Sequence, residues 1–132
     1  MPANILIIED DSASRELVKY LLEASGYTVL TAEDGRAGLR TALEAHPDLV
    51  LCDLQMPMMN GYEVVQRLRE HPGWHHVPMI AVTAFSMTGD REAALAAGFD
   101  DHITKPITPE TFIGQIESFL PPVLRGSRPA YR

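Results

Sequence analysis

Side chains able to carry out phosphoryl chemistry stand at the ends of four short apolar runs. These are Glu9 and Asp10 after ILII, Asp53 after LVLC, Thr83 at the end of MIAVT, and Lys105 after HIT. A carboxylate at the end of a buried run is costly unless a partner or a reaction uses it. Clustered carboxylates also repel one another unless a cation joins them. Hard oxygen ligands with room for water suit Mg²⁺, so a shared crevice would predict a magnesium site.

Each residue type in this set has a chemical use. A carboxylate such as Asp53, held beside Mg²⁺ and a lysine, can attack a phosphoryl group and form an aspartyl phosphate. The transfer requires positioning and neutralisation of the phosphoryl oxygens, which the metal and Lys105 can supply. The hydroxyl of Thr83 can donate a hydrogen bond to a phosphoryl oxygen once it is attached.

The elements that must position these residues alternate along the chain. Strands are predicted over 5–8, 27–32, 49–52, 79–83 and 102–104, and helices over 12–25, 34–46, 61–70, 90–97 and 109–119. This order predicts an α/β fold with a five-stranded parallel sheet and helices on both faces. The continuous apolar runs fit strands covered on both faces. Ligands of such sheets bind beyond the carboxyl ends of the strands, where all the side chains named above would lie.

Composition narrows the class of protein. The chain has 132 residues, a formal net charge of −7 and one cysteine, Cys52. Its length suits one domain, and its acidity disfavours direct binding to nucleic acid. No intramolecular disulfide is possible, the N-terminus does not resemble a signal peptide, and no run reaches the length of a membrane span. We therefore expect a cytoplasmic domain without direct nucleic-acid contact or membrane insertion.

The motifs taken together carry a family resemblance. The set IIEDD, DLQMP followed by NG, VTA and TKP resembles the receiver domain of two-component response regulators from residue 4 to about residue 120. The resemblance implies a (βα)5 flavodoxin-like fold with strand order 2-1-3-4-5. It places a receiver domain at 1–120 and leaves 121–132 as a disordered tail or a truncated linker.

The resemblance also implies a metal site. Asp53 would be the phosphoacceptor, and Glu9 with Asp10 the acidic pair at the first strand end. Mg²⁺, with Mn²⁺ as a substitute, would be held by Glu9, Asp10, Asp53 and the main-chain carbonyl of Gln55. Asp11 is expected instead at the N-terminus of the first helix, where the helix dipole favours an anion.

Further positions correspond to the family's switch and phosphate contacts, and one of them departs from its pattern. Thr83 matches the switch hydroxyl and Lys105 the phosphate-pairing lysine, with a cis peptide bond expected before Pro106. The family often has Tyr or Phe where this chain has His102, which titrates near neutral pH. We therefore expect the coupling between Thr83 and His102 to be altered or pH-sensitive. Phe85 is expected to slow hydrolysis by crowding the attacking water.

The implied function is that of a signalling switch and not of an enzyme that turns over substrate. A histidine kinase or histidine phosphotransfer protein would phosphorylate Asp53. The change would then be read by a protein partner at the surface of the fourth helix, fifth strand and fifth helix. We expect a stand-alone regulator. The sequence does not decide whether phosphorylation makes it form a dimer. The alternatives are a receiver domain cut from a longer regulator or hybrid histidine kinase, and a receiver-like binding module that works without phosphate.

Other phosphoryl and metal chemistries fit the residues less well. Haloacid-dehalogenase-like phosphatases carry a second acid two residues after the nucleophile, where this chain has Gln55. No GxxxxGK[ST] motif is present for a P-loop, and a flavodoxin-like nucleotide site would not explain the acids and the lysine. The loop histidines His71, His75 and His76 lack a supporting cysteine, so a solvated loop is preferred over a zinc site.

Overall fold

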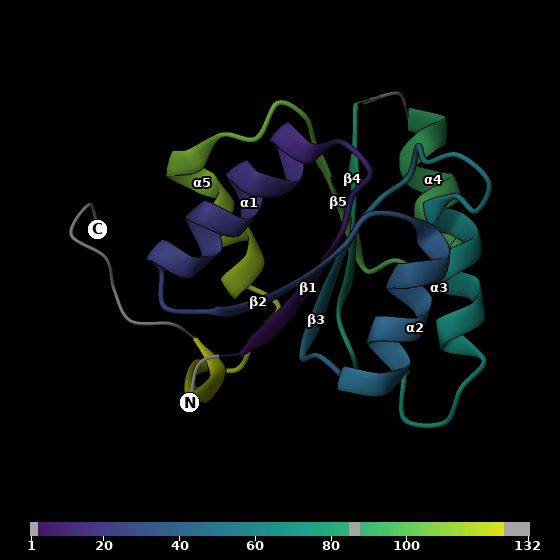
Figure 1. Ribbon diagram of the computed structural model, residues 1–132, viewed down its shortest axis with the longest axis horizontal. Coiled ribbons are helices and arrows are strands. Elements are labelled where there is room, and N and C mark those ends of the chain that lie inside the picture. Colours follow the sequence, from purple (N-terminus) through teal and green to yellow (C-terminus); the bar gives the residue numbers. More distant parts are fainter. Residues whose placement is uncertain (1–2, 85–87, 126–132) are drawn as a thin grey trace.

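A computed structural model describes residues 3–84 and 88–125 of the chain (Figure 1). The strands are β1 (Asn4–Ile8), β2 (Thr28–Ala32), β3 (Leu49–Asp53), β4 (Met79–Thr83) and β5 (Asp101–Thr104). The helices are α1 (Ser12–Ala24), α2 (Gly35–Ala45), α3 (Gly61–Arg69), α4 (Thr88–Ala97) and α5 (Pro109–Glu117), and a short 3-10 helix, η1 (Pro122–Leu124), follows. The predicted alternation of strands and helices is confirmed.

The five strands form one parallel sheet in the order β2-β1-β3-β4-β5. This order is the predicted one. The chain runs from β1 to β2 on one side of it and then crosses to β3 on the other side. The strands are parallel, so the carboxyl ends of β1 and β3 lie next to each other. In the register of the sheet, Ile8 of β1 pairs with Cys52 of β3, and Asp53 pairs with Val82 of β4. The residues that follow these pairs therefore reach the same edge.

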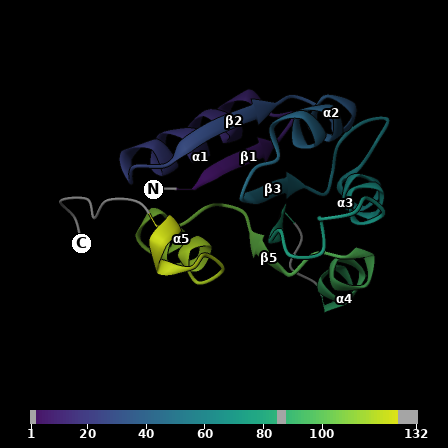
Figure 2. The same ribbon diagram turned by 90° about the horizontal axis from the view of Figure 1, so that it is seen from below.

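Helices cover both faces of the sheet, with α1 and α5 on one face and α2, α3 and α4 on the other (Figures 1 and 2). Alternate strand residues supply two cores because successive side chains of a strand point to opposite faces. In β3, for example, Val50 and Cys52 contact the core under α2 to α4, whereas Leu49 and Leu51 contact the core under α1 and α5. The wholly apolar strands thus have the burial that their sequence predicts.

Several element boundaries differ from the predicted ones by one or two residues. Tyr27 was predicted in a strand, but its N–H donates to the carbonyl of Leu22 and so closes the end of α1. Gly26, with φ of 96°, supplies the left-handed conformation that this helix ending requires. At the other end of the chain, α5 stops at Glu117, because the N–H of Phe119 donates to Ile116 three residues back.

The orientation of α2 was not evident from its leucines. Leu39 and Leu43 lie one turn apart, yet the fully buried residues of the helix are Gly35, Gly38 and Ala42. A Cβ added at Gly38 would lie 2.6 Å from the side chain of Ile8. Because only small residues allow α2 to approach the sheet this closely, its leucines are turned toward α3 and solvent.

The described chain continues past the last predicted helix as η1. A hydrogen bond joins η1 to the residue before β1: the N–H of Ala3 donates to the carbonyl of Leu124 at 2.7 Å. Residues 126–132 and Phe85 lie outside the described residues, so the boundary at 120, the tail and the role of Phe85 stay predictions. Within the described ranges, no helix has the length and apolar character needed to cross a bilayer.

Candidate functional site

Three carboxylates converge at the carboxyl edge of the sheet. Glu9 and Asp10 come from the loop after β1, and Asp53 is the last residue of β3. One ligand oxygen from each lies within 4.8 Å of the others. Glu9 and Asp53 are almost fully buried, whereas Asp10 is exposed. The predicted acidic cluster therefore forms, with one open side through which water or a substrate can approach.

Lys105, which follows β5, completes the charge balance of the crevice. Its Nζ lies 2.8 Å from Oε1 of Glu9 and 3.8 Å from Oδ2 of Asp53. The lysine thus pairs mainly with Glu9, and it neutralises the negative charge of Asp53 only in part. Its own main-chain N–H donates to the carbonyl of Thr83 at 2.7 Å, which holds the lysine against the end of β4. The peptide bond between Lys105 and Pro106 is cis.

The start of α1 fixes the acidic loop. Asp11 caps the helix by accepting a hydrogen bond from the N–H of Ser14 at 2.8 Å, as predicted for this residue. That bond lowers the pKa of Asp11. The N–H of Asp11 donates in turn to Oε2 of Glu9 at 3.1 Å. Asp11 thus positions its neighbour, which orients the Glu9 carboxylate before any ligand binds.

Two residues that support the site were not identified from the sequence. A guanidinium nitrogen of Arg15 donates to the main-chain carbonyl of Glu9 at 2.8 Å. Gly61 starts α3 so close to β3 that an added Cβ would lie 2.5 Å from the main-chain oxygen of Asp53. Arg15, on the helix turn after the acids, gave no distinguishing signal. Gly61 could have been found from the Asn60-Gly61 pair, because a glycine directly after a cap indicates close backbone approach.

Thr83 and His102 lie on neighbouring strands behind the crevice. Thr83 is buried at the end of β4. His102 of β5 is partly buried, and its Nδ1 is enclosed without a hydrogen-bond partner among the described residues. That nitrogen is 3.9 Å from Oδ1 of Asp101, which instead accepts from the main-chain N–H of His102.

The electrostatics of the crevice leave Asp53 poised between two protonation states. Burial, followed by the neighbouring Glu9 carboxylate, raises the pKa of Asp53 from 3.8 to about 7. The charge of Lys105 and the N–H of Gln55, which donates to Oδ1 at 3.3 Å, oppose that rise. Burial alone would lower the pKa of Lys105, but its hydrogen bond to Glu9 and the charge of Asp53 raise it overall. A bound cation would therefore favour the ionised form of Asp53.

We expect the metal-free protein to lose part of its stability as pH rises from about 4 to about 7. In this range the folded protein holds a proton on Asp53 that the unfolded chain has released, because the pKa rises on folding from 3.8 to about 7. This contribution to the free energy of unfolding is fully present below the lower value and lost above the higher one. Urea denaturation of the wild type and of Asp53→Asn, both in the presence of a chelator, measures this contribution. At pH about 8 the variant is expected to be more stable by about 1 kcal/mol or more, and a difference independent of pH would contradict the assignment.

The donor set fits a hard divalent cation. Mg²⁺ prefers oxygen ligands and keeps several waters, and the three acids supply carboxylate oxygens with Asp10 on the side open to water. Among the described residues this is the only group of three or more acidic, histidine or cysteine side chains close enough to share an ion. The loop histidines form no such group among the described residues. Cys52 is buried, and burial raises the pKa of its thiol, so it offers no thiolate ligand.

Comparisons with known proteins agree with this geometry. The chain is 41% identical over 120 residues to the polar-differentiation response regulator DivK of Brucella anthropi, covering 91% of this chain and 98% of DivK. The fold is similar to that of the chemotaxis protein CheY4 of Vibrio cholerae, with a TM-score of 0.87 and 30% identity over 91% of this chain and all of that one.

A second solved structure bears on the metal. The receiver domain of a sensor histidine kinase from Pseudomonas aeruginosa has a magnesium ion coordinated in its active-site cleft. It is similar to this chain with a TM-score of 0.83 and 29% identity, covering 90% of this chain and 98% of that one. The family model of the response regulator receiver domain matches residues 5–117. The chain therefore belongs to the response regulator receiver family, whose members are phosphorylated signalling switches of two-component systems and not enzymes that turn over substrate.

Proposed function

We propose that Asp53 accepts a phosphoryl group from a histidine kinase or a histidine phosphotransfer protein in a Mg²⁺-dependent step. The observation that carries the proposal is the position of Asp53. It is a buried carboxylate at the end of β3, with two further acids and a lysine around it. No structural role for such a group is apparent, because an ionised buried carboxylate without a full partner weakens the fold.

The chemistry assigns a role to each residue. An oxygen of Asp53 attacks the phosphorus, the bond between phosphorus and the donor imidazole nitrogen breaks, and its electron pair returns to the imidazole. Glu9, Asp10, Asp53 and the main-chain carbonyl of Gln55 would hold Mg²⁺, which when bound neutralises charge on the phosphoryl oxygens. Lys105, already 3.8 Å from Asp53, is placed to pair with one of those oxygens.

Incubation with acetyl phosphate and Mg²⁺ tests this proposal without a known kinase. Intact-mass analysis should show one added phosphoryl group on the protein, and chelation of the metal should prevent its addition. Mn²⁺ should support the reaction in place of Mg²⁺ because it accepts the same oxygen ligands. Absence of an adduct with acetyl phosphate and with every cognate kinase tried would favour the alternative of a binding module that works without phosphate.

The output would be a change in protein binding at the α4-β5-α5 face. Phosphorylation adds negative charge at the sheet edge, and the hydroxyl of Thr83 is expected to move toward it as a hydrogen-bond donor. The main-chain N–H of Lys105 donates to the carbonyl of Thr83 at 2.7 Å. A movement at the carboxyl end of β4 is therefore transmitted to the carboxyl end of β5. This biases a two-state equilibrium at that face. The same mechanism applies to a stand-alone regulator, to a receiver domain of a longer regulator or hybrid kinase, and to a dimer formed on phosphorylation.

We expect His102→Tyr to change the pH dependence of switching. The Nδ1 of His102 is enclosed without a hydrogen-bond partner among the described residues, so no hydrogen bond at that nitrogen fixes the orientation of the ring. The exchange replaces an ionisable imidazole by a phenol. Amide NMR shifts on phosphorylation, recorded from about pH 5.5 to about pH 8, should follow different pH profiles in the wild type and in the variant. Identical profiles for the two proteins would sink the idea.

A further inference from the structure

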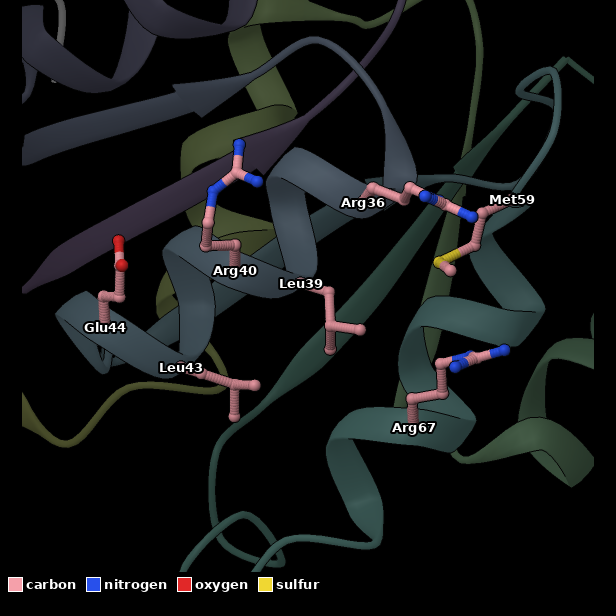
Figure 3. A pocket seen from close by; sticks show the side chains of 7 residues that line it. All are labelled: Arg36, Leu39, Arg40, Leu43, Glu44, Met59 and Arg67. Atoms are coloured by element: carbon pink, nitrogen blue, oxygen red, sulfur yellow. The ribbon is translucent and has the colours of Figure 1, made fainter.

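A groove with an apolar floor and a basic rim runs between α2 and α3 (Figure 3). It has a volume of about 460 Å³ and lies on the side of the sheet opposite α1 and α5. Its lining residues are Arg36, Leu39, Arg40, Leu43, Glu44, Met59 and Arg67. Figure 3 shows the two leucines of α2 and Met59 projecting toward the space between the helices. The phosphorylation chemistry described above uses none of these side chains.

The apolar floor results from the orientation of α2. Because the helix turns its small residues to the sheet, Leu39 is only partly buried and Leu43 is 38% exposed. A second hollow of about 470 Å³ shares Arg36, Arg40 and Met59 with the first and reaches the loop before α3. There Met58 is 92% exposed. The two hollows therefore form one continuous groove with apolar side chains along it, of the kind that a partner covers.

The first hollow carries a charge opposite to that of the protein. The first hollow has three arginines and one glutamate, a balance of +2, whereas the chain as a whole carries −7. In the second hollow Glu33 and Asp34 balance the charges of Arg36 and Arg40, so the positive charge belongs to the first hollow. Within residues 3–84 and 88–125, the side chains of Arg36, Arg40 and Arg67 form no ion pair or hydrogen bond. These cations remain available to a partner.

The arrangement on α2 also does not stabilise the helix. Arg36 and Arg40 are one turn apart, and like charges at this spacing weaken a helix. Glu44 is one turn beyond Arg40 but forms no ion pair with it in the described structure. The basic residues are therefore not explained by local helix stability.

We propose that the first hollow of this groove, between α2 and α3, binds an acidic amphipathic helix of a partner protein. The apolar floor would receive side chains spaced three and four residues apart, and the arginines would pair with Asp or Glu on the flanks of that helix. A small inorganic anion would leave Leu39, Leu43 and Met59 without a role. Nucleic acid is disfavoured by the net charge of −7. Because the groove is formed without a phosphoryl group, its binding does not depend on the proposed modification of Asp53.

Titration of the ¹⁵N-labelled 132-residue chain with designed peptides tests this proposal. The probes are helical peptides of about 15 residues with leucines on one face and glutamates beside them, in a panel that varies the register of the leucines. At least one should bind with a Kd in the micromolar range, with amide shifts confined to α2, α3 and the loop between Asp53 and Gly61. The Asp53→Asn variant should bind the same peptide equally well.

Matched variants separate the contributions of charge and apolar contact. Arg40→Glu should weaken binding about tenfold or more, and Leu43→Ser about fivefold. Arg91→Glu makes the same charge change at an exposed arginine of α4 outside the groove, and should change the Kd by less than about twofold. Circular dichroism with thermal melting confirms that each variant folds.

Four results would overturn the proposal. One is the absence of saturable binding by any peptide up to about 1 mM. Another is a set of amide shifts that maps outside the groove. Equal binding by peptides with serine in place of leucine would show charge attraction alone. Concentration-dependent self-association that shifts the same amides without peptide would assign the groove to a second copy of this chain.

Discussion

Replacing Asp53 with asparagine is expected to abolish stable capture of a phosphoryl group, a loss of at least about 100-fold in incorporation. The amide keeps the size and the hydrogen bond from Gln55 but lacks a nucleophilic oxygen. It also removes one of the three carboxylates that would hold the metal. The measurement is intact mass after incubation with acetyl phosphate and Mg²⁺, at matched protein concentration and time.

Asp34→Asn is the matched control for this prediction. Asp34 is outside the site and caps α2 by accepting a hydrogen bond from the N–H of Ala37. Asparagine caps a helix about as well as aspartate does, so this variant removes one negative charge with little effect on the fold. It should be phosphorylated at the wild-type level. Equal labelling of Asp53→Asn and the wild type would contradict the assignment of the acceptor.

Gly61→Ala is expected to lower the free energy of unfolding by about 1–3 kcal/mol. An added Cβ would lie 2.5 Å from the main-chain oxygen of Asp53 and 3.0 Å from the Cα of Leu54. Since both contacts are with backbone, the methyl group cannot be accommodated by turning a side chain. α3 must move away from β3, and Asp53 moves with it, so acetyl phosphate labelling should also slow.

Gly114→Ala, a glycine-to-alanine change in another helix, is expected to raise the free energy of unfolding. Gly114 lies within α5, and an added Cβ would have no neighbouring atom within 4 Å. Alanine there should stabilise the protein by about 0.5–1 kcal/mol, because glycine in a helix loses more conformational freedom on folding. Urea denaturation of both variants and the wild type measures the two effects. Equal stability of Gly61→Ala and the wild type would show that α3 can relax without disturbing β3.

The strand runs and the residues that follow them were predictable because burial on both faces leaves a simple pattern. ILII, LVLC and MIAV are apolar without interruption, and a polar residue follows each of these three runs. Parallel topology then brings Glu9, Asp53 and Lys105 to one edge whatever the intervening helices contain. The strand order itself came from the family resemblance and not from the count of strands.

The orientation of α2 and the supports of the site could not be predicted in the same way. On a helical pattern Leu39 and Leu43 favour a buried face, but close packing of Gly38 against Ile8 decides the orientation. The uneven distances of Lys105 to Glu9 and Asp53 depend on side-chain positions that spacing along the chain does not specify. The arginine rim of the groove likewise becomes visible only when α2 and α3 lie side by side.

The most direct test of the central claim is to locate the phosphoryl group chemically. An aspartyl phosphate is an acyl phosphate, which borohydride reduces to homoserine, whereas an unmodified carboxylate does not react. After labelling with acetyl phosphate and Mg²⁺, reduction and peptide mass spectrometry, we predict homoserine at position 53 and at no other aspartate. Homoserine at another position, or a phosphoryl adduct that leaves position 53 as aspartate, would contradict the account.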